Sequence, residues 1–194
     1  DRMLKRMHRL GNRAAIESLV DRIRTRIPMV TFRTAFIVGF PGETDAAYTE
    51  LRDYVERAEF DRVAVFLYSD EEGTGAVGLD EKVERDVMDE RRNEILSIQE
   101  SISAAKGRAT VGSILEVLID GRSEETEHVL EGRHEGLAPE IDGVVYIDEG
   151  PSDTTSQRPA RHNVSSPTPG EFCKVEITDA SAFDLVGRIV TAPV

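Results

Sequence analysis

The chain has 194 residues, a net charge of −13 and a single cysteine, Cys173. One thiol excludes an intrachain disulfide and a cysteine-based metal site, and the four histidines show no metal-binding spacing. There is no signal-like start and no apolar run long enough to span a membrane, so we expect a soluble, cytoplasmic protein that binds no membrane. Residues 1–9 lack an initiator methionine and enter an amphipathic pattern at once, which indicates a fragment of a longer protein.

The charge is distributed unevenly along the chain. Residues 1–33 carry a net charge of +6, residues 34–109 of −9 and residues 110–194 of −10. The acidic last third argues against phosphate-backbone binding there, because nucleic-acid affinity comes mainly from basic side chains. It favours a basic protein partner, although solubility alone also explains such a charge.

The first part of the chain alternates between predicted helices and strands. Apolar residues at helical spacing predict a helix over Arg13–Arg26, which Pro28 ends. A strand over Phe32–Val38, a helix over Asp45–Arg57 and a strand over Arg62–Tyr68 follow. Strand, helix and strand with short joints imply parallel pairing and a right-handed crossover. Two strands do not make a stable sheet, so we expect further strands upstream of residue 1.

The joint after the first strand reads G-F-P-G-E-T over residues 39–44. Pro41-Gly42 suits the central positions of a type II turn, and Thr44 suits the cap of the following helix. Such a joint occurs in any α/β domain. It also places backbone amides and the carboxylate of Glu43 at the carboxyl end of a parallel strand, where α/β folds build sites.

A second polar loop, Asp70–Ala76, follows the next strand and begins with three consecutive acids. Charge runs usually form a solvated loop, and adjacent carboxylates rarely converge on one cation. The position of this loop is more informative than its charge. Two successive strands end in glycine-containing polar loops on the same edge of the predicted sheet.

The remaining chain is predicted to form one long helix and then short strands. The helix is predicted to cover Asp80–Ala105, and Gly107 is expected to terminate it. The pair Arg91-Arg92 is predicted on its polar side, and we assign no chemistry to the helix. Alternating patterns then predict strands in a small antiparallel barrel with Cys173 as a packing residue. These strands are Ile114–Ile119, Gly143–Ile147, Phe172–Ile177 and Val186–Val190. The stretch Pro151–Pro169 is predicted to be a mobile loop.

Four motifs occur in a fixed order: Met7-His8-Arg9, I-V-G-F-P-G-E-T at 37–44, F-x-Y-S-x-E-E-G-T-x-A at 66–76, and R-R-x-x-x-L-x-x-Q-x-x-I-S at 91–103. Together they resemble the radical-SAM methylthiotransferases over nearly the whole chain. The resemblance implies an α/β fold. Residues 1–107 would be the C-terminal part of a radical-SAM (β/α) partial TIM barrel with its linking helix. Residues 108–194 would be a TRAM domain, a small antiparallel OB-like β-barrel.

Two details are similar to the RimO-type branch, which acts on an aspartate of small-subunit ribosomal protein twelve. One is Glu71-Glu72, where the MiaB-type tRNA enzymes usually carry Arg-Pro, and the other is Ala138–Gly143 in the barrel. The acidic barrel agrees with a basic ribosomal protein as partner, and we expect a monomer. The alternatives are a tRNA adenosine methylthiotransferase, which the charge disfavours, and a non-catalytic acidic docking module for a basic protein.

The family's C-x-x-x-C-x-x-C motif, which ligates the catalytic [4Fe–4S] cluster, is absent from the chain. By the family's order it lies upstream of Asp1, so we expect the chain alone to be inactive, with no catalytic residue and no metal ligand of its own. S-adenosylmethionine and [4Fe–4S] clusters would serve the parent enzyme.

The resemblance also implies a cofactor-binding wall at the ends of the two strands. Ile37, Val38 and Gly39 would line the adenine of S-adenosylmethionine, and Phe66, Tyr68 and Ser69 would complete that wall. Arg9 would meet the carboxylate of S-adenosylmethionine, with solvation of the helix as the alternative role. Glu43 would either accept backbone amides of the turn or approach the ribose, and we favour the first, structural role.

Overall fold

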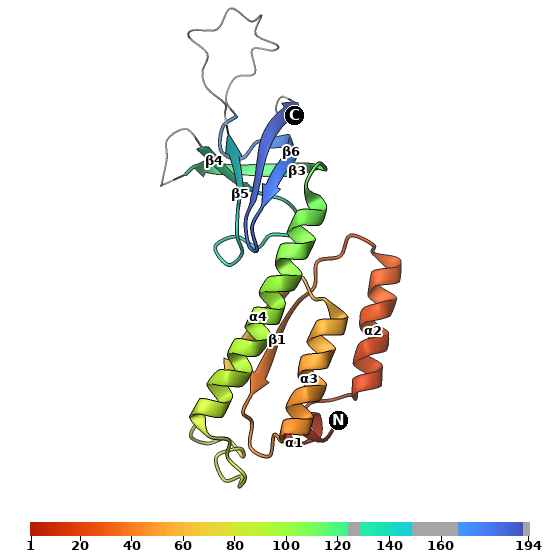
Figure 1. Cartoon of the computed structure of the whole chain (residues 1–194), viewed down its shortest axis with the longest axis vertical. Coiled ribbons are helices and arrows are strands. Elements are labelled where there is room, and N and C mark those ends of the chain that lie inside the picture. The colour runs from red at the N-terminus through yellow and green to blue at the C-terminus, as the bar shows by residue number, and fades with distance from the viewer. Residues whose placement is uncertain (124–128, 149–166, 192–194) are drawn as a thin grey trace, which may run out of the picture. The chain divides into compact units, whose positions relative to one another are not determined.

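The computed structural model describes residues 1–123, 129–148 and 167–191, and the chain divides into two compact units, Asp1–Ile102 and Ser103–Val194 (Figure 1). Each unit is described by itself. In the described part of the chain, no helix combines the length and apolar character needed to cross a membrane.

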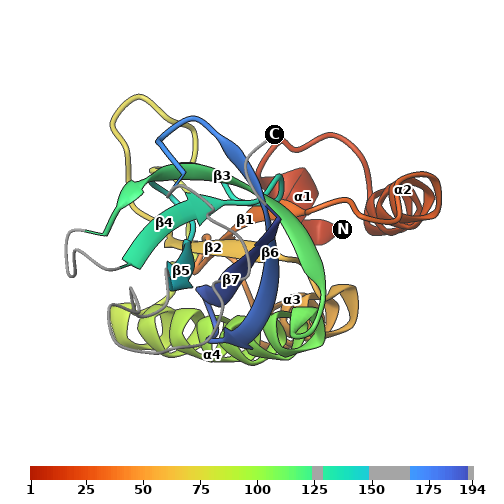
Figure 2. The same cartoon turned by 90° about the horizontal axis from the view of Figure 1, so that it is seen from above.

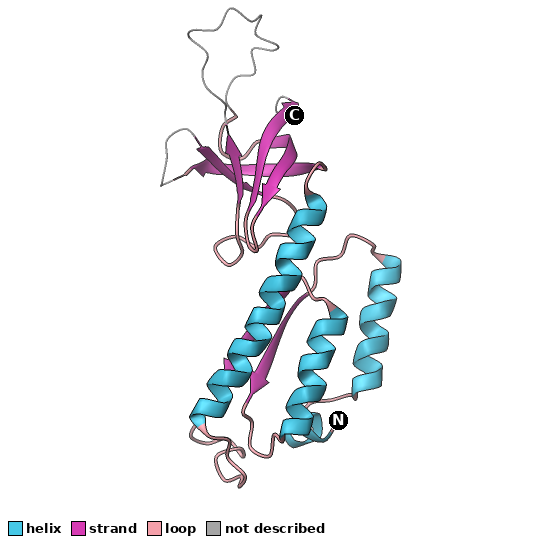
Figure 3. Cartoon of the chain, viewed as in Figure 1, coloured by secondary structure: helices cyan, strands magenta, loops and turns pink. Residues whose placement is uncertain are grey.

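The first unit consists of a two-stranded parallel sheet and the helices that surround it in sequence (Figure 3). Strand β1 (Arg33–Val38) pairs with β2 (Arg62–Leu67) in parallel, from Arg33 opposite Arg62 to Val38 opposite Leu67. The predicted parallel strand–helix–strand arrangement is therefore confirmed. The helices are α1 (Arg2–Arg6), α2 (Arg13–Arg26), α3 (Asp45–Ala58) and the first part of α4 (Arg85–Thr110).

Among the described residues of the first unit, helices cover one face of this sheet. Phe36 and Val38 of β1 pack against Tyr48 and Val55 of α3 and against Ile95 of α4. Because side chains alternate along a strand, the residues between them point to the opposite face, which is exposed. The core of the unit therefore lies between the sheet and helices α3 and α4.

Helix ends follow local chemistry where a cap residue is present. The side chain of Asn12 accepts a hydrogen bond from Ala15 N–H at the start of α2. Thr44 accepts one from Ala47 N–H at 3.3 Å, so the predicted cap of α3 is confirmed. Helix α2 ends at Arg26, two residues before Pro28, as predicted.

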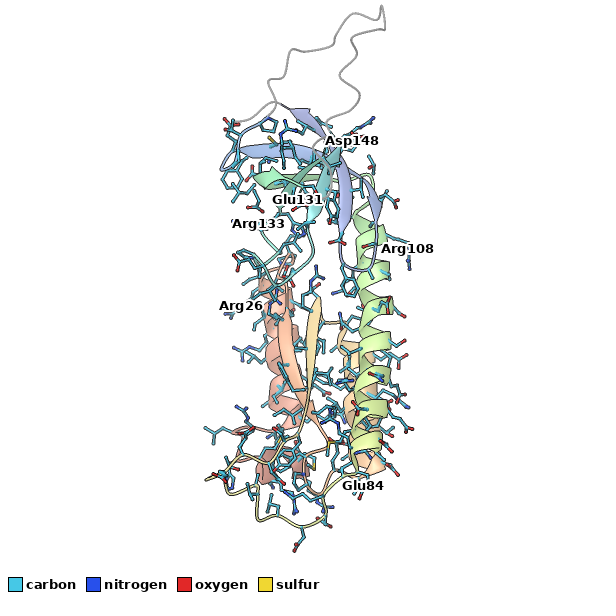
Figure 4. The ribbon with its side chains drawn as sticks, turned by 90° about the vertical axis from the view of Figure 1, so that its left-hand side faces the viewer. Arg26, Glu84, Arg108, Glu131, Arg133 and Asp148 are labelled. Atoms are coloured by element: carbon cyan, nitrogen blue, oxygen red, sulfur yellow. The ribbon has the colours of Figure 1, made fainter. Side chains whose placement is uncertain are left out.

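The long helix differs from its prediction at both ends. It begins at Arg85, because residues 80–84 form a loop in which Glu81 has a φ of +63° and its carbonyl accepts a hydrogen bond from Gly42 N–H at 2.8 Å. It continues past Gly107 to Thr110. A Cβ at Gly107 would lie 3.0 Å from Ser181 O, so close packing and not helix termination explains this glycine. Glu84 and Arg108, near the two ends of α4, are labelled in Figure 4.

The second unit is a closed five-stranded barrel in the order β3-β4-β5-β7-β6, seen from above in Figure 2. A small antiparallel barrel was expected; the barrel is confirmed, and it departs from the expectation in one strand pair. Strand β4 was missed, and β5 and β7 pair in parallel whereas all other neighbours pair antiparallel. The strands are β3 (Ile114–Arg122), β4 (Val129–Arg133), β5 (Val145–Asp148), β6 (Phe172–Ala180) and β7 (Leu185–Thr191).

The barrel interior is an apolar cluster to which every strand contributes. Val117, Val145, Ile147 and Val175 are fully buried in it. Cys173 is 1% exposed within the same cluster, so its interpretation as a packing residue is confirmed. Most of the loop predicted over 151–169 lies outside the described residues.

Candidate functional site

The turn after β1 has the geometry that its sequence predicts. Glu43 N–H donates to Phe40 C=O at 2.9 Å, and Gly42, preceded by proline, has a φ of +85°. These features define a type II turn. Gly39 also has a positive φ, +79°, and a Cβ there would lie 2.4 Å from Met88 Cγ. Gly39 is buried, and the side chain of Met88 occupies the space that a Cβ would need, so this position requires glycine.

A buried carboxylate fixes this turn from behind. Oε1 of Glu43 accepts the N–H of Gly39 at 3.0 Å and an N–H of the Arg91 guanidinium at 2.7 Å. The structural role favoured for Glu43 is thus confirmed. The same guanidinium bonds Asp45 Oδ1 at 2.7 Å, so one arginine links the turn to the first turn of α3.

The placement of Arg91 on the polar side of the long helix was wrong. Arg91 is 6% exposed, and its partner Glu43 lies 48 residues earlier in the chain. A guanidinium presents several N–H donors in a planar fork, so it satisfies two carboxylates at once. Arg92 beside it is solvated and pairs with Asp89 at 3.1 Å, as a polar-side residue would.

Arg6, which the sequence did not single out, holds the front of the turn. Its Nε–H donates to Pro41 C=O at 2.7 Å, and its guanidinium pairs with Glu81 at 3.2 Å. Arg9, the predicted contact of a carboxylate, follows α1 and is exposed. Its position in the M-x-R motif drew attention to it, whereas no local pattern marks Arg6.

At the end of β2, a tyrosine and an aspartate share one lysine. Tyr68 N–H donates to Val38 C=O at 2.9 Å, which extends the pairing of the two strands. The hydroxyl of Tyr68 donates to Asp70 Oδ1 at 2.7 Å, and Lys82 bonds the same oxygen and lies 5.1 Å from the centroid of the Tyr68 ring. Lys82 was missed, because it comes from the loop before α4.

This contact shifts the titration of all three groups. Hydrogen bonds from Lys82 and then from Tyr68 hold the pKa of Asp70 below its usual value. The bond to Asp70 raises the pKa of Lys82, and desolvation, followed by the bond to Asp70, raises the pKa of Tyr68. An ion pair between Asp70 and Lys82 therefore connects the loop after β2 to the loop before α4.

The exposed sheet face brings two of the predicted residues together. Ile37 and Phe66 lie opposite each other in the register of β1 and β2 and are 39% and 58% exposed. Val38 is buried as a whole residue, main chain included, and its carbonyl already accepts the N–H of Tyr68. The hydroxyl of Ser69, which follows the strand, donates to Glu71 Oε1 at 3.0 Å. The strand ends therefore offer an exposed apolar face, whereas the carbonyl of Val38 is already engaged within the protein.

No group of three or more His, Cys, Asp or Glu side chains converges on a metal position anywhere in the part of the chain that the structure describes. The acids after Tyr68 turn instead to neighbouring donors. The described site is an exposed apolar face at Ile37 and Phe66, next to a turn that Glu43 and Arg6 hold by hydrogen bonds.

In comparison with known protein families, residues 111–190, which form the barrel, match the TRAM domain. Over 98% of its length the chain is 45% identical to "Ribosomal protein uS12 methylthiotransferase RimO" of Anaeromyxobacter sp. (strain K) and 46% identical to that of Sorangium cellulosum. The protein of the same name from Geobacter sulfurreducens is 39% identical over 98% of the chain. The chain is homologous to one segment of these methylthiotransferases, and it spans 36 to 39% of their length.

Proposed function

We propose that this chain is part of a radical-SAM methylthiotransferase that adds a methylthio group to an aspartate of ribosomal protein uS12 in the cytoplasm. The observation that carries the proposal is the identity of 45% with a uS12 methylthiotransferase over 98% of the chain. That match includes both strand-end loops and the barrel. The parallel β1–β2 pair and the TRAM barrel agree with the architecture that such an enzyme requires.

Within this proposal the strand ends form part of the S-adenosylmethionine site. The adenine would lie against Ile37 and Phe66, whose exposed side chains share one sheet face. Val38 and Gly39 would lie behind the adenine at the end of β1, where both residues are buried and the N–H of Gly39 is held by Glu43. The cofactor supplies the radical chemistry, and the protein orients it and excludes water.

Three further side chains complete the proposed site. Tyr68 would border the adenine, since its ring packs edge-on against Phe40 with centroids 5.1 Å apart. Ser69 would contribute its hydroxyl at the same strand end. Arg9, exposed after α1, would meet the carboxylate of S-adenosylmethionine, where a guanidinium binds two oxygens at once.

The residues of this chain do not fit an iron–sulfur cluster. Such a cluster is held by several cysteine thiolates. The only cysteine, Cys173, is buried in the barrel, where burial and then the nearby Glu171 raise the pKa of its thiol. We therefore propose that the chain alone is inactive and that the cluster ligands belong to another part of the parent enzyme.

The barrel would recognise the ribosomal protein. Residues 110–194 carry a net charge of −10, which complements a basic polypeptide and repels the phosphates of tRNA. Its described Lys and Arg side chains are largely engaged within the barrel. Lys174 pairs with Glu116 at 2.8 Å and Arg188 with Glu176 at 2.8 Å. We propose that the enzyme acts as a monomer on this protein substrate.

The test uses the complete open reading frame that contains this chain. The protein is purified, supplied anaerobically with iron, sulfide and reductant, and incubated with S-adenosylmethionine and either uS12 or tRNA. We expect cleavage of S-adenosylmethionine and one methylthio group on an aspartate of uS12, detected by mass spectrometry. Modification of tRNA adenosine instead would reassign the substrate. A cluster-loaded protein without cleavage would leave only the docking role.

A further inference from the structure

Two loops of the barrel form a common surface, which we call the acidic loop pair. One is the β4–β5 loop, residues 134–144, and the other is the β6–β7 turn with its flanks, residues 178–187. A Cβ at Gly143 would lie 2.1 Å from Phe183 O, so the two backbones touch. Only glycine permits this approach, because the obstructing atom is main chain and not a flexible side-chain end.

Hydrogen bonds join the two loops at the same place. Val144 N–H donates to Asp184 Oδ1 at 2.9 Å, and Leu185 N–H donates to Val144 C=O at 3.0 Å. Ser181 Oγ in turn accepts the N–H of Asp184 at 2.8 Å. The loops are therefore fixed relative to each other and to the strands that follow them.

The β4–β5 loop is also rigid internally. Leu137 is 7% exposed and anchors the loop in the barrel core. Asp142 closes the segment on itself: its Oδ2 accepts Ala138 N–H at 2.8 Å, and its own N–H donates to Ala138 C=O at 3.2 Å. Glu140 between them has a φ of +61°. This backbone presents the side chains of residues 139–141 outward.

The most exposed large apolar side chains of the loop pair come one from each loop. Ile141 is 74% exposed, and Phe183 is 59% exposed. Single exposed apolar residues are ordinary on protein surfaces. Two of them on touching, preorganised loops are a different case, because binding there needs little further ordering of the chain.

The loop pair has charge of one sign only. Residues 134–144 and 178–187 contain no Lys or Arg. Their acidic residues are Glu135, Glu140, Asp142, Asp179 and Asp184. Two apolar side chains surrounded by carboxylates complement a basic segment that carries an apolar side chain.

We propose that the acidic loop pair docks such a segment of the ribosomal protein substrate, with Ile141 and Phe183 as its apolar contacts and Glu140 as a charge contact. This rests on the proposed function, which supplies the partner, and adds the surface that recognises it. A nucleic acid would bring phosphates against carboxylates. A second copy of the chain would bring the same acidic loops together, which like-charge repulsion opposes.

The test measures binding of the whole chain to purified uS12 by isothermal titration calorimetry at low salt. The variant Ile141→Ser with Phe183→Ser removes both apolar contacts and keeps the charges, and we expect at least tenfold weaker binding. Glu140→Gln should weaken binding severalfold and lessen its salt dependence, since one carboxylate is lost. Phe172→Ser is the matched control, because Phe172 is 46% exposed on β6 outside the loop pair.

The outcomes separate the two proposals. Unchanged binding by Ile141→Ser with Phe183→Ser, or an equal loss in Phe172→Ser, would overturn the loop pair as the docking surface and leave the partner intact. A wild-type chain that binds no uS12 would overturn the partner itself. Tight tRNA binding that the double substitution weakens would assign the surface to nucleic acid instead. Circular dichroism and thermal melting confirm that each variant is folded.

Discussion

The two units of the chain stabilise their strands differently. In the barrel, each strand has a partner on both sides, and the interior is an apolar cluster with fully buried Val117, Val145 and Ile147. In the first unit, β1 and β2 pair only with each other among the described residues, and one face of the pair exposes Ile37 and Phe66.

This difference explains where the polar side chains are buried. A closed barrel fixes its strands mainly by pairing and apolar packing. The strand ends of the open unit need side chains to hold them, and the buried pair Glu43–Arg91 does so. The unit with the exposed ligand-sized face is thus the one whose geometry depends on a few polar contacts.

The sharpest way to break the first unit is to remove one member of its buried ion pair. Arg91→Met leaves the Glu43 carboxylate buried without its cation, so we expect a loss of about 3–5 kcal/mol in the stability of this unit. Hydrogen exchange of the β1 and α3 amides measures the loss and should leave the barrel amides unchanged.

The neighbouring arginine provides the control. Arg92→Met removes a half-exposed pair with Asp89 and hydrogen bonds to Asn93 Oδ1 at 3.4 Å, for which we expect about 1 kcal/mol or less. The double variant Glu43→Gln with Arg91→Met should recover part of the loss, because no uncompensated charge remains. A single Arg91→Met variant as stable as wild type would contradict the role given to the pair.

In the barrel, the substitution expected to destabilise most is one in the apolar interior. Ile147→Ala opens a cavity at a fully buried position of β5, and we expect a loss of about 2–5 kcal/mol confined to the barrel. Urea unfolding with hydrogen exchange of the barrel strands measures it. Val186→Ala, at a residue 37% exposed on β7, should change stability by about 0.5 kcal/mol or less. Equal losses in the two variants would disprove the contrast.

The smallest effect concerns the loop contact of Tyr68, Asp70 and Lys82. The lowered pKa of Asp70 makes its contribution present above the ordinary value of 3.8 and lost as pH falls through the folded pKa. The raised pKa of Lys82 makes its contribution present below the ordinary value of 10.5 and lost as pH rises through the folded pKa. The contact should therefore persist between these limits.

Nuclear magnetic resonance of the Lys82 Nζ and Asp70 carboxyl groups follows this titration. In Asp70→Asn the pKa of Lys82 should move toward its ordinary value, because the hydrogen bond that raises it is lost. An unchanged Lys82 titration in the variant would contradict the contact.

Local chemistry alone determined much of this protein. The type II turn before Glu43, the Thr44 cap and the bounds of α2 follow from residues a few positions apart, and the alternating strands predicted a small barrel. Such features depend on backbone preferences and on spacing, which the sequence contains directly.

Tertiary structure decided what depends on distant partners. The sequence pattern predicted Arg91 to be solvated, but the fold places Glu43 against it. No local sequence pattern predicted the contacts of Lys82 and Arg6. The start of α4 moved to Arg85 because the preceding loop bonds the turn after β1 instead of winding into helix. The physical reason is common to these cases: a side chain's free energy depends on which groups surround it, and pairing across 48 residues is set by packing and not by any local pattern.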